Sequence, residues 1–154
     1  MKNKVFITSE GLGKLKKEYK ELVEAKRPSV AERIKKAREH GDVSENAEYD
    51  AAREEQAFLE GRIQELEEIL RDAQVVREDL KKSGIVTVGS KVKVHMDGVE
   101  ETYRIVGAVE ADPQKRKISH ESPLGLALLG KKVGDIIEYS APVGKLRLHI
   151  LEIR

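Results

Sequence analysis

Apolar side chains in the first half of the chain recur at the spacing of a helical seam. They follow alternating steps of three and four residues between about residues 9 and 38, with an interruption between residues 22 and 30, and again between about residues 43 and 73. The first row consists of Leu12, Leu15, Tyr19, Leu22, Val30, Ile34 and Ala37, and the second of Ala52, Gln56, Leu59, Ile63, Leu66, Leu70 and Ala73. Both rows are narrow, as in a coiled coil, so the pattern predicts two long helices that meet along one seam.

The ends of these helices carry start and stop signals. Thr8 or Ser9 can supply the N-cap oxygen of the first helix, and Gly41 can end it with a positive φ. Pro28 lacks a backbone donor, so we expect a kink or break near residues 26–29. A short connection joins the two helices, which must therefore pack antiparallel. At about 1.5 Å per residue, roughly 30 residues make a rod of about 45 Å whose end projects into solvent.

From about residue 84 the apolar residues alternate with polar ones, which is typical of β-strands. KVKVHM and VEETYRIV flank Asp97-Gly98, a pair that favours a two-residue type I′ hairpin. Ser122 and Pro123 predict the start of a short helix that Gly130 closes. Further strands are predicted at RKIS (116–119), IIEYS and LRLHILEI, the last two joined by a turn at Pro142-Val143-Gly144. We therefore expect a small α+β domain, with one helix on four or five antiparallel strands.

These patterns divide the chain into a helical hairpin at 1–76 with its tip at 40–46, a connector at 77–84, and a sheet domain at 85–154. The composition agrees, because 37% of the residues are charged and 4% are aromatic, which leaves little material for one large core. There is no cysteine, and the first residues, MKNKVFITSEGLGK, lack the apolar run of a signal peptide. No stretch approaches the roughly 20 apolar residues of a membrane span, so we expect a cytoplasmic protein without membrane contact.

The charges are distributed unevenly, although their sum is only +1. Residues 1–38 carry 12 Lys and Arg against 5 Asp and Glu, a net charge of +7. Residues 39–74 carry 3 against 12, a net charge of −9. Antiparallel helices with these charges would attract one another across the seam, although two solvated faces of mixed charge would also explain the pattern.

The sequence lacks the signatures of a self-contained enzyme. No G-x-x-x-x-G-K-[ST] or G-x-G-x-x-G phosphate loop and no G-x-S-x-G nucleophile elbow occurs. The four histidines, which are scattered and form no i,i+4 pair, argue against a histidine metal site. They are His40, His95, His120 and His149. The predicted tip of the hairpin is therefore the place to look for chemistry.

The predicted tip concentrates acidic residues. Between Arg38 and Arg53 there are five carboxylates and no lysine or arginine, namely Glu39, Asp42, Glu45, Glu48 and Asp50. Asp42 and Glu45 match a variant of the capping box, in which both stabilise a helix start and need no other function. The same spacing puts the two carboxylates one turn apart, where they can share a hard divalent cation. Two carboxylates bind Mg²⁺ weakly, so such a site would need completion by a partner.

Three segments carry a family resemblance. They are AREHGDVSENAEYDAAREEQAFLEGRIQELE (37–67), the AQVV that follows shortly after, and SPLGLALLGKKVGD (122–135). Together they resemble the bacterial Gre transcript-cleavage factors over essentially the whole chain, and the tip motif G-D-x-x-E-N-A-E-Y is specific to that family. The resemblance implies an N-terminal antiparallel coiled-coil hairpin and a C-terminal FKBP-like domain. It also implies a factor, not itself an enzyme, that enters the secondary channel of RNA polymerase. There it would stimulate the polymerase to cut backtracked RNA and so rescue arrested complexes.

The resemblance implies roles for four residues near the tip. Asp42 and Glu45 match the family's tip carboxylates, which help hold a catalytic Mg²⁺ and the attacking water in the polymerase active site. Arg38 and Arg53 match basic positions that face the extruded 3′ end of the RNA, although an ordinary i,i+4 helix pair would also explain each arginine. No cofactor is expected in the free protein, because the Mg²⁺ would be shared with the polymerase. We expect a monomer whose C-terminal domain docks on the polymerase.

Other interpretations stay open on these residues. A non-catalytic factor could occupy the same channel and inhibit the polymerase, and a coiled-coil adaptor or chaperone could have no part in transcription. Glu48 and Asp50 are expected only to cap or solvate the second helix. An FKBP-like fold does not by itself carry prolyl isomerase activity, and the second half has only Tyr103 and Tyr139 to line a proline pocket.

Overall fold

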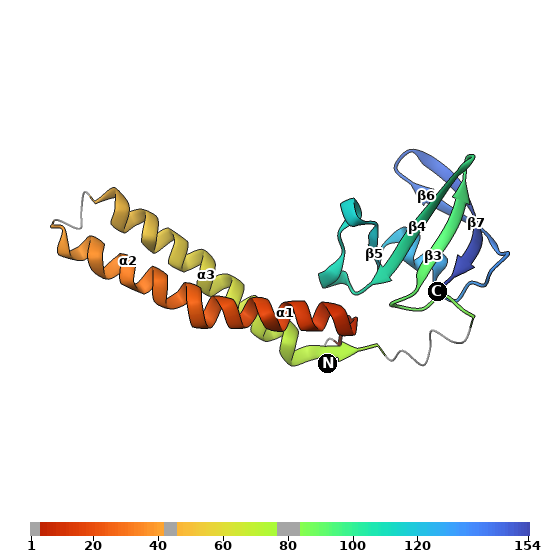
Figure 1. Cartoon of the computed structure of the whole chain (residues 1–154). Helices are drawn as coiled ribbons and strands as arrows, with labels where there is room; N and C mark the ends of the chain where they lie inside the picture. The colour runs from red at the N-terminus through yellow and green to blue at the C-terminus, as the bar shows by residue number, and fades with distance from the viewer. Residues whose placement is uncertain (1–3, 42–45, 77–83) are drawn as a thin grey trace. The chain divides into compact units, whose positions relative to one another are not determined.

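The computed structural model describes residues 4–41, 46–76 and 84–154 (Figure 1). In these residues the chain forms two compact units. The hairpin unit spans Leu12–Asp72, and the sheet unit joins the N-terminal residues up to Gly11 to the chain from Ala73 onward. The predicted α+β class, a helical hairpin followed by a sheet domain, is confirmed. None of the helices in the described ranges is long and apolar enough to cross a membrane.

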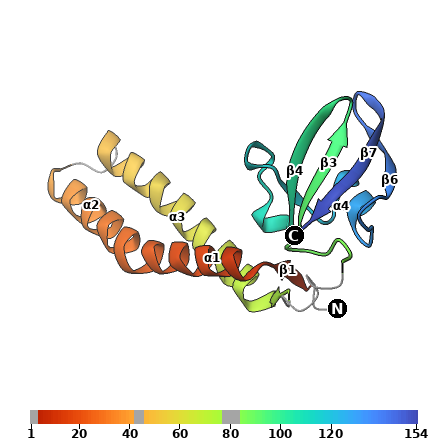
Figure 2. The ribbon, with the colours of Figure 1, turned by 45° about the vertical axis from the view of Figure 1, so that its right-hand side comes forward.

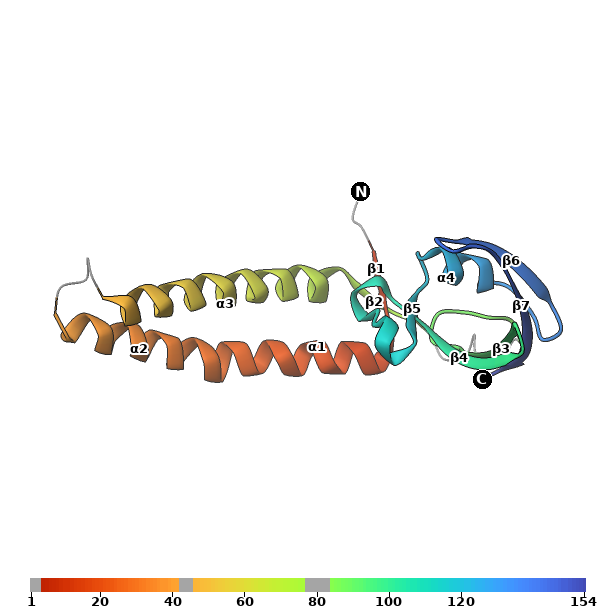
Figure 3. The same ribbon diagram turned by 90° about the horizontal axis from the view of Figure 1, so that it is seen from above.

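Two arms of helix form the hairpin (Figure 3). The first arm runs through α1 (Ser9–Glu21), the π-helical η1 (Leu22–Lys26) and α2 (Arg27–Glu39), and the second is α3 (Ala47–Asp72). The Thr8 hydroxyl accepts a hydrogen bond from the Gly11 N–H at 3.1 Å and so caps α1, as predicted. Both long helices are confirmed, but the second begins at Ala47 instead of residue 43.

Pro28 alters the first arm without ending it. The expected kink or break takes the form of η1, after which α2 continues with Pro28 in its first turn. The N–H of Arg27 donates to the carbonyl of Leu22, five residues back, instead of the usual four. Pro28 has no N–H, so one i→i−4 hydrogen bond of the helix is missing here in any case. A wider turn at this position therefore sacrifices fewer backbone hydrogen bonds than it would elsewhere in the arm.

The seam between the arms is the core of the hairpin unit. Its buried residues are Val30, Ile34 and Ala37 from α2, and Ala52, Leu59, Ile63 and Leu66 from α3. Tyr19, Leu22, Val23 and Tyr49 pack against this core and are partly buried. Every buried residue belongs to one of the two predicted rows, so the spacing of the sequence identified the packing face correctly.

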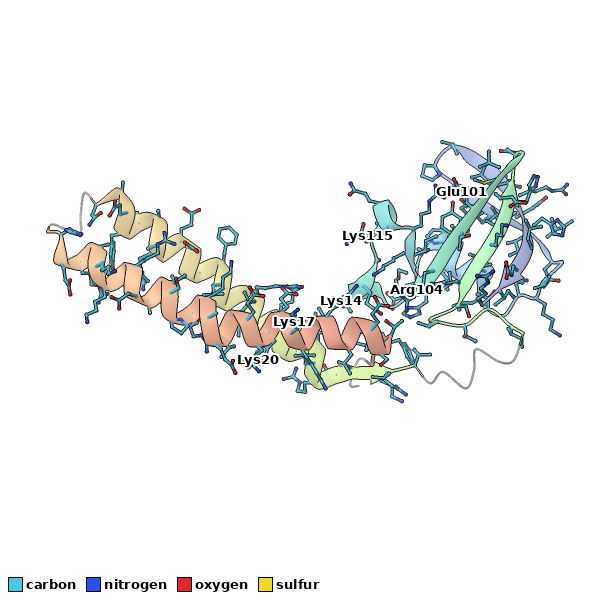
Figure 4. The ribbon with its side chains drawn as sticks, in the orientation of Figure 1. Lys14, Lys17, Lys20, Glu101, Arg104 and Lys115 are labelled. Carbon is cyan, nitrogen blue, oxygen red and sulfur yellow. The ribbon has the colours of Figure 1, made fainter. Side chains whose placement is uncertain are left out.

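Charged side chains join the two arms across the seam. The inter-arm ion pairs among the described residues are Arg27–Glu60 at 2.8 Å, Arg62–Glu18 at 2.7 Å, and Arg33–Glu55. Hydrogen bonds from Arg62 to Glu18 and Glu65 hold the pKa of its guanidinium above the ordinary range. Ion pairing across the seam is therefore confirmed. Two pairs join a basic first arm to an acidic second arm as predicted, whereas Arg62–Glu18 has the opposite direction. Lys14, Lys17 and Lys20 add to the positive charge of α1 (Figure 4).

The main sheet of the second unit has five strands among the described residues, in the order β5-β4-β3-β7-β6 (Figure 1). Their bounds are Lys91–Met96 for β3, Val99–Val106 for β4, Lys117–Ser119 for β5, Ile136–Ala141 for β6 and Gly144–Ile153 for β7. The turn between β3 and β4 has φ values of 49° at Asp97 and 81° at Gly98, and the predicted type I′ turn requires positive φ at both positions.

One strand contradicts the prediction of an antiparallel sheet. β5 runs parallel to β4, with Arg104 opposite Lys117, so the sheet is mixed. A parallel neighbour needs a crossover, and two 3-10 turns, η4 (Ala108–Glu110) and η5 (Pro113–Lys115), provide it. The Asp112-Pro113 turn signal is genuine, but this turn belongs to a path that returns the chain to Arg104, so that β5 lies beside the last residues of β4.

The short helix α4 (Pro123–Leu128) packs on the sheet, as predicted. The Ser122 hydroxyl caps it by accepting a hydrogen bond from the Gly125 N–H at 3.0 Å. A Cβ on Gly125 would lie 2.0 Å from the Ser119 carbonyl oxygen, so glycine is required for this close approach. The buried core of the unit consists of Val86, Val92, Val94, Ile105, Leu128, Ile137, Leu148 and Ile150.

A parallel strand pair that the sequence did not predict joins the N-terminal segment to residues 73–75 within the sheet unit. β1 (Val5–Ile7) pairs with β2 (Ala73–Val75). The Glu110 carboxylate then joins this segment to the crossover. It accepts hydrogen bonds from the N–H groups of Thr8 at 2.9 Å and Gly107 at 3.1 Å, and from the Thr8 hydroxyl. The start of α1 is thereby anchored within the sheet unit.

Candidate functional site at the end of the hairpin

The four predicted site residues are distributed around the connection between α2 and α3. Arg38 lies in the last turn of α2, and Arg53 lies in the second turn of α3. Asp42 and Glu45 lie outside the described residues. A shared cation at these two carboxylates therefore stays a prediction, whereas both arginines lie in described helices.

Asn46 fastens the two arms to each other where they end. Its Oδ1 accepts hydrogen bonds from the N–H groups of Glu48 at 3.1 Å and Tyr49 at 3.2 Å. Its Nδ2 donates to the carbonyl of Ala37 in α2 at 2.7 Å. One side chain thus satisfies free donors of α3 and an acceptor of α2. The N-cap of α3 is Asn46 and not the predicted Asp42.

Sequence reasoning missed Asn46, although a signal was present. Asparagine is a favoured N-cap residue, and Glu48 and Asp50 follow it in what is the first turn of α3. Both acids lie where the helix dipole favours negative charge, as predicted. The carbonyl of Ala37, in contrast, is brought to Asn46 only by the packing of the arms.

Arg38 is held against an aromatic ring. Its guanidinium carbon lies 5.7 Å from the centre of the Tyr49 ring, within the range of a cation–π interaction. Tyr49 packs in turn on the buried seam. Among the residues with described positions, no carboxylate pairs with Arg38. The one carboxylate four residues away, Asp42, lies outside those residues, so the i,i+4 ion pair stays an open alternative for Arg38.

Arg53 projects from α3 into solvent. One Nη donates to the Gln56 amide oxygen at 3.0 Å, three residues along the helix. The residues four places from Arg53 are Tyr49 and Ala57, so the i,i+4 ion pair that we considered as the alternative has no carboxylate partner here. Arg38 and Arg53 each directly follow a buried alanine of the seam, Ala37 or Ala52. Both arginines therefore lie next to the seam, close to the connection between the arms.

A shallow depression beside this connection adds residues that the sequence analysis did not single out. Its lining consists of Arg33, Lys36, Ala37 and His40 from α2, and Glu48 and Ala51 from α3. Arg33 forms an ion pair with Glu55, whereas Lys36 and Glu48 contribute one charge of each sign to the lining. The spacing of these residues on one helix was the signal that could have revealed them.

Family models match both parts of the chain. The model described as transcription elongation factor, N-terminal, matches residues 5–75, and the model described as transcription elongation factor, GreA/GreB, C-terminal, matches residues 81–154. The chain belongs to the GreA/GreB family of transcription elongation factors. The family resemblance inferred from the tip motif is thereby confirmed.

Similar members of the GreA/GreB family match along the whole chain. The transcription elongation factor GreA of Thermoanaerobacter pseudethanolicus is 52% identical over 156 residues, covering 100% of this chain and 99% of its own. The GreA of Acetivibrio thermocellus is 53% identical over 152 residues, covering 97% and 96%. Among solved structures, the GreA factor homolog 1 (Gfh1) of Thermus thermophilus is 29% identical, covers 99% of both chains and has a TM-score of 0.47.

Proposed function

We propose that the chain binds RNA polymerase through its secondary channel and stimulates the polymerase's own endonucleolytic cleavage of backtracked RNA. Cleavage leaves a new 3′ end at the polymerase active site, and the arrested complex resumes elongation. The chain is then a monomeric cofactor protein and not an enzyme, and its sheet domain docks on the polymerase. The observation that carries the proposal is the end of the hairpin, where α2 ends at Glu39 and α3 begins at Ala47. Asp42 and Glu45 belong to the residues between them.

On this proposal Asp42 and Glu45 help hold a catalytic Mg²⁺ and the attacking water. Carboxylate oxygens are the ligands that Mg²⁺ prefers, and paired metal ions stabilise the attacking and leaving oxygens of phosphoryl transfer. Two carboxylates fill only part of the octahedral shell, so the ion would be shared with the polymerase and not carried by the free protein. Because Asn46 caps α3, the cap does not require either acid, which favours the metal interpretation.

Arg38 and Arg53 would contact the extruded 3′ end of the RNA. A guanidinium binds phosphate oxygens through charge-assisted hydrogen bonds, and two arginines flanking the carboxylates would leave the metal ligands free. The stacking of Arg38 on Tyr49 supports this role, because it limits the side chain to a small range of positions before RNA arrives.

The test is RNA cleavage in backtracked complexes of bacterial RNA polymerase. We expect Asp42→Asn and Glu45→Gln to slow the factor-stimulated cleavage about 100-fold, the size of loss seen when one group that stabilises developing charge is removed. Binding to the polymerase should remain near that of the wild type. Asp50→Asn is the matched control, since it removes one carboxylate from the exposed first turn of α3 and should leave cleavage intact.

Each alternative predicts a different outcome of the same experiment. If Asp42→Asn and Glu45→Gln stimulate cleavage at the wild-type rate, the tip carboxylates do not deliver the metal. If the wild-type chain slows transcription without shortening the RNA, it is a non-catalytic inhibitor of the channel. If it fails to bind the polymerase at moderate salt, it is an adaptor unrelated to this reaction.

A further inference from the structure

We propose that His95 and His149 form a binding site for a divalent transition-metal ion on the exposed face of the sheet. The site is independent of the hairpin and of the proposed function. It depends on the pairing of β3 with β7, which lie side by side in the sheet (Figure 2). The four histidines form no i,i+4 pair along the chain, but that criterion applies to helices, and a sheet brings residues together by register.

The register places the two histidines directly opposite each other. β3 and β7 are antiparallel, and His95 is the partner of His149. Directly opposed residues in such a pair have Cβ atoms about 4.5–5.5 Å apart. Val94 and Ile150, their neighbours in the two strands, are fully buried on the core side. Because side chains alternate along a strand, both imidazole rings project from the opposite, exposed face.

Two imidazoles at this separation can converge on one ion. The distance from an imidazole nitrogen to a bound zinc ion is about 2.0–2.1 Å, so a single ion bridges the gap between opposed rings. Imidazole suits Zn²⁺, Ni²⁺ and Cu²⁺, and the Irving–Williams order makes Cu²⁺ the tightest of the three. Among the residues whose positions are described, no group of three or more His, Cys, Asp or Glu side chains gathers to hold a metal. The site is therefore an open two-histidine chelate whose other positions are taken by water.

One carboxylate lies beside the histidine pair in the sheet register. Glu100 is the partner of His95 on the other side, in β4, so a carboxylate and two imidazoles form one row across three strands. A carboxylate beside a ligating histidine can accept the proton of its other ring nitrogen and orient the ring.

The lysine two residues before His95 and the arginine two residues before His149 are both paired with carboxylates. Lys93 binds Glu100 at 2.9 Å, and Arg147 binds Glu138 at 2.7 Å. An arriving divalent ion therefore meets little uncompensated positive charge at the two rings.

The site is tested by titrating the full chain, free of any histidine tag, with Ni²⁺ alone by calorimetry. We expect one ion per chain, released by a chelator. His95→Asn and His149→Asn should each weaken binding at least about tenfold, because even the loss of an outer-shell partner costs 10–100-fold in metal affinity. The double variant should bind Ni²⁺ as tightly as whichever single variant has the lower affinity, since one ring alone cannot chelate the ion. His40→Asn removes a histidine far along the sequence and serves as the matched control.

A second measurement locates the ion. Substoichiometric Cu²⁺, which is paramagnetic, should broaden the backbone amide resonances around residues 95 and 149 before others. The proposal is overturned if either single variant binds Ni²⁺ like the wild type, or if His40→Asn loses as much affinity. It is also overturned if Cu²⁺ broadens resonances elsewhere first. Equal unfolding midpoints of the variants without metal would show that any lost binding is not a loss of folding.

Discussion

Removing the Glu110 carboxylate should loosen the start of α1. This group accepts three hydrogen bonds, of which two come from backbone N–H groups of Thr8 and Gly107 and one from the Thr8 hydroxyl. The same hydroxyl caps α1 at Gly11, so the carboxylate also positions the cap. The informative pair of variants is Glu110→Ala, which deletes all three acceptor contacts, and Glu110→Gln, which keeps the shape of the side chain.

The expected magnitudes follow from these contacts. A hydrogen bond to a charged group contributes about 1.5–3 kcal/mol, and loss of an N-cap costs about 0.5–2 kcal/mol. Glu110 is only partly buried, so water replaces some of the lost contacts. We therefore expect Glu110→Ala to cost about 3 kcal/mol in the free energy of unfolding of the sheet unit. In Glu110→Gln the amide oxygen can still accept both backbone bonds and the amide NH₂ can donate to Thr8, so the cost should be about 1 kcal/mol.

Urea denaturation of each variant measures the total effect. Since two compact units can unfold separately, amide hydrogen exchange at Gly11 provides a local reporter of the cap. Glu121→Ala is the control, because the Glu121 side chain is 70% exposed and its loss should change stability by less than about 0.5 kcal/mol. If Glu110→Ala is as mild as this control, or if Glu110→Gln is as damaging as Glu110→Ala, the carboxylate does not anchor the helix in the way described.

Two further predictions concern the hairpin end and the sheet. Asn46→Ala should lower the stability of the hairpin unit by about 1–2 kcal/mol, because it removes the cap of α3 and the hydrogen bond to Ala37. Asn46→Asp should keep the cap. Thermal unfolding of the two variants measures the difference. Burial and the hydrogen bond to Glu101 raise the pKa of Tyr103 from 10.0 to about 12, so the folded state holds this proton more tightly. The resulting stabilisation is complete below about pH 10 and is lost as the pH rises towards 12. The test is a tyrosinate absorbance titration of the wild type and of Tyr103→Phe. If the two curves are the same, Tyr103 does not have the raised pKa.

The amino-acid sequence by itself determined the local elements of this protein. The two rows of seam residues identified both long helices, since a helical face depends only on spacing along the chain. The Asp97-Gly98 turn and the Ser122 cap were predicted for the same reason, because each depends on a few neighbouring residues. At the candidate site, the positions of Arg38 and Arg53 near the tip also followed from the order of residues.

Only the tertiary structure decided the contacts between distant segments. The direction of β5 depends on how the crossover returns to β4, and the β1–β2 pair joins strands of three residues each, too short to show a period. Asn46 reaches Ala37 only because the two arms pack together, and Glu110 reaches Thr8 across 102 residues of sequence. His95 and His149 meet through sheet register alone. Such pairings depend on which faces of the strands and helices are buried, and not on the conformational preference of neighbouring residues. A short segment of the sequence therefore does not predict them.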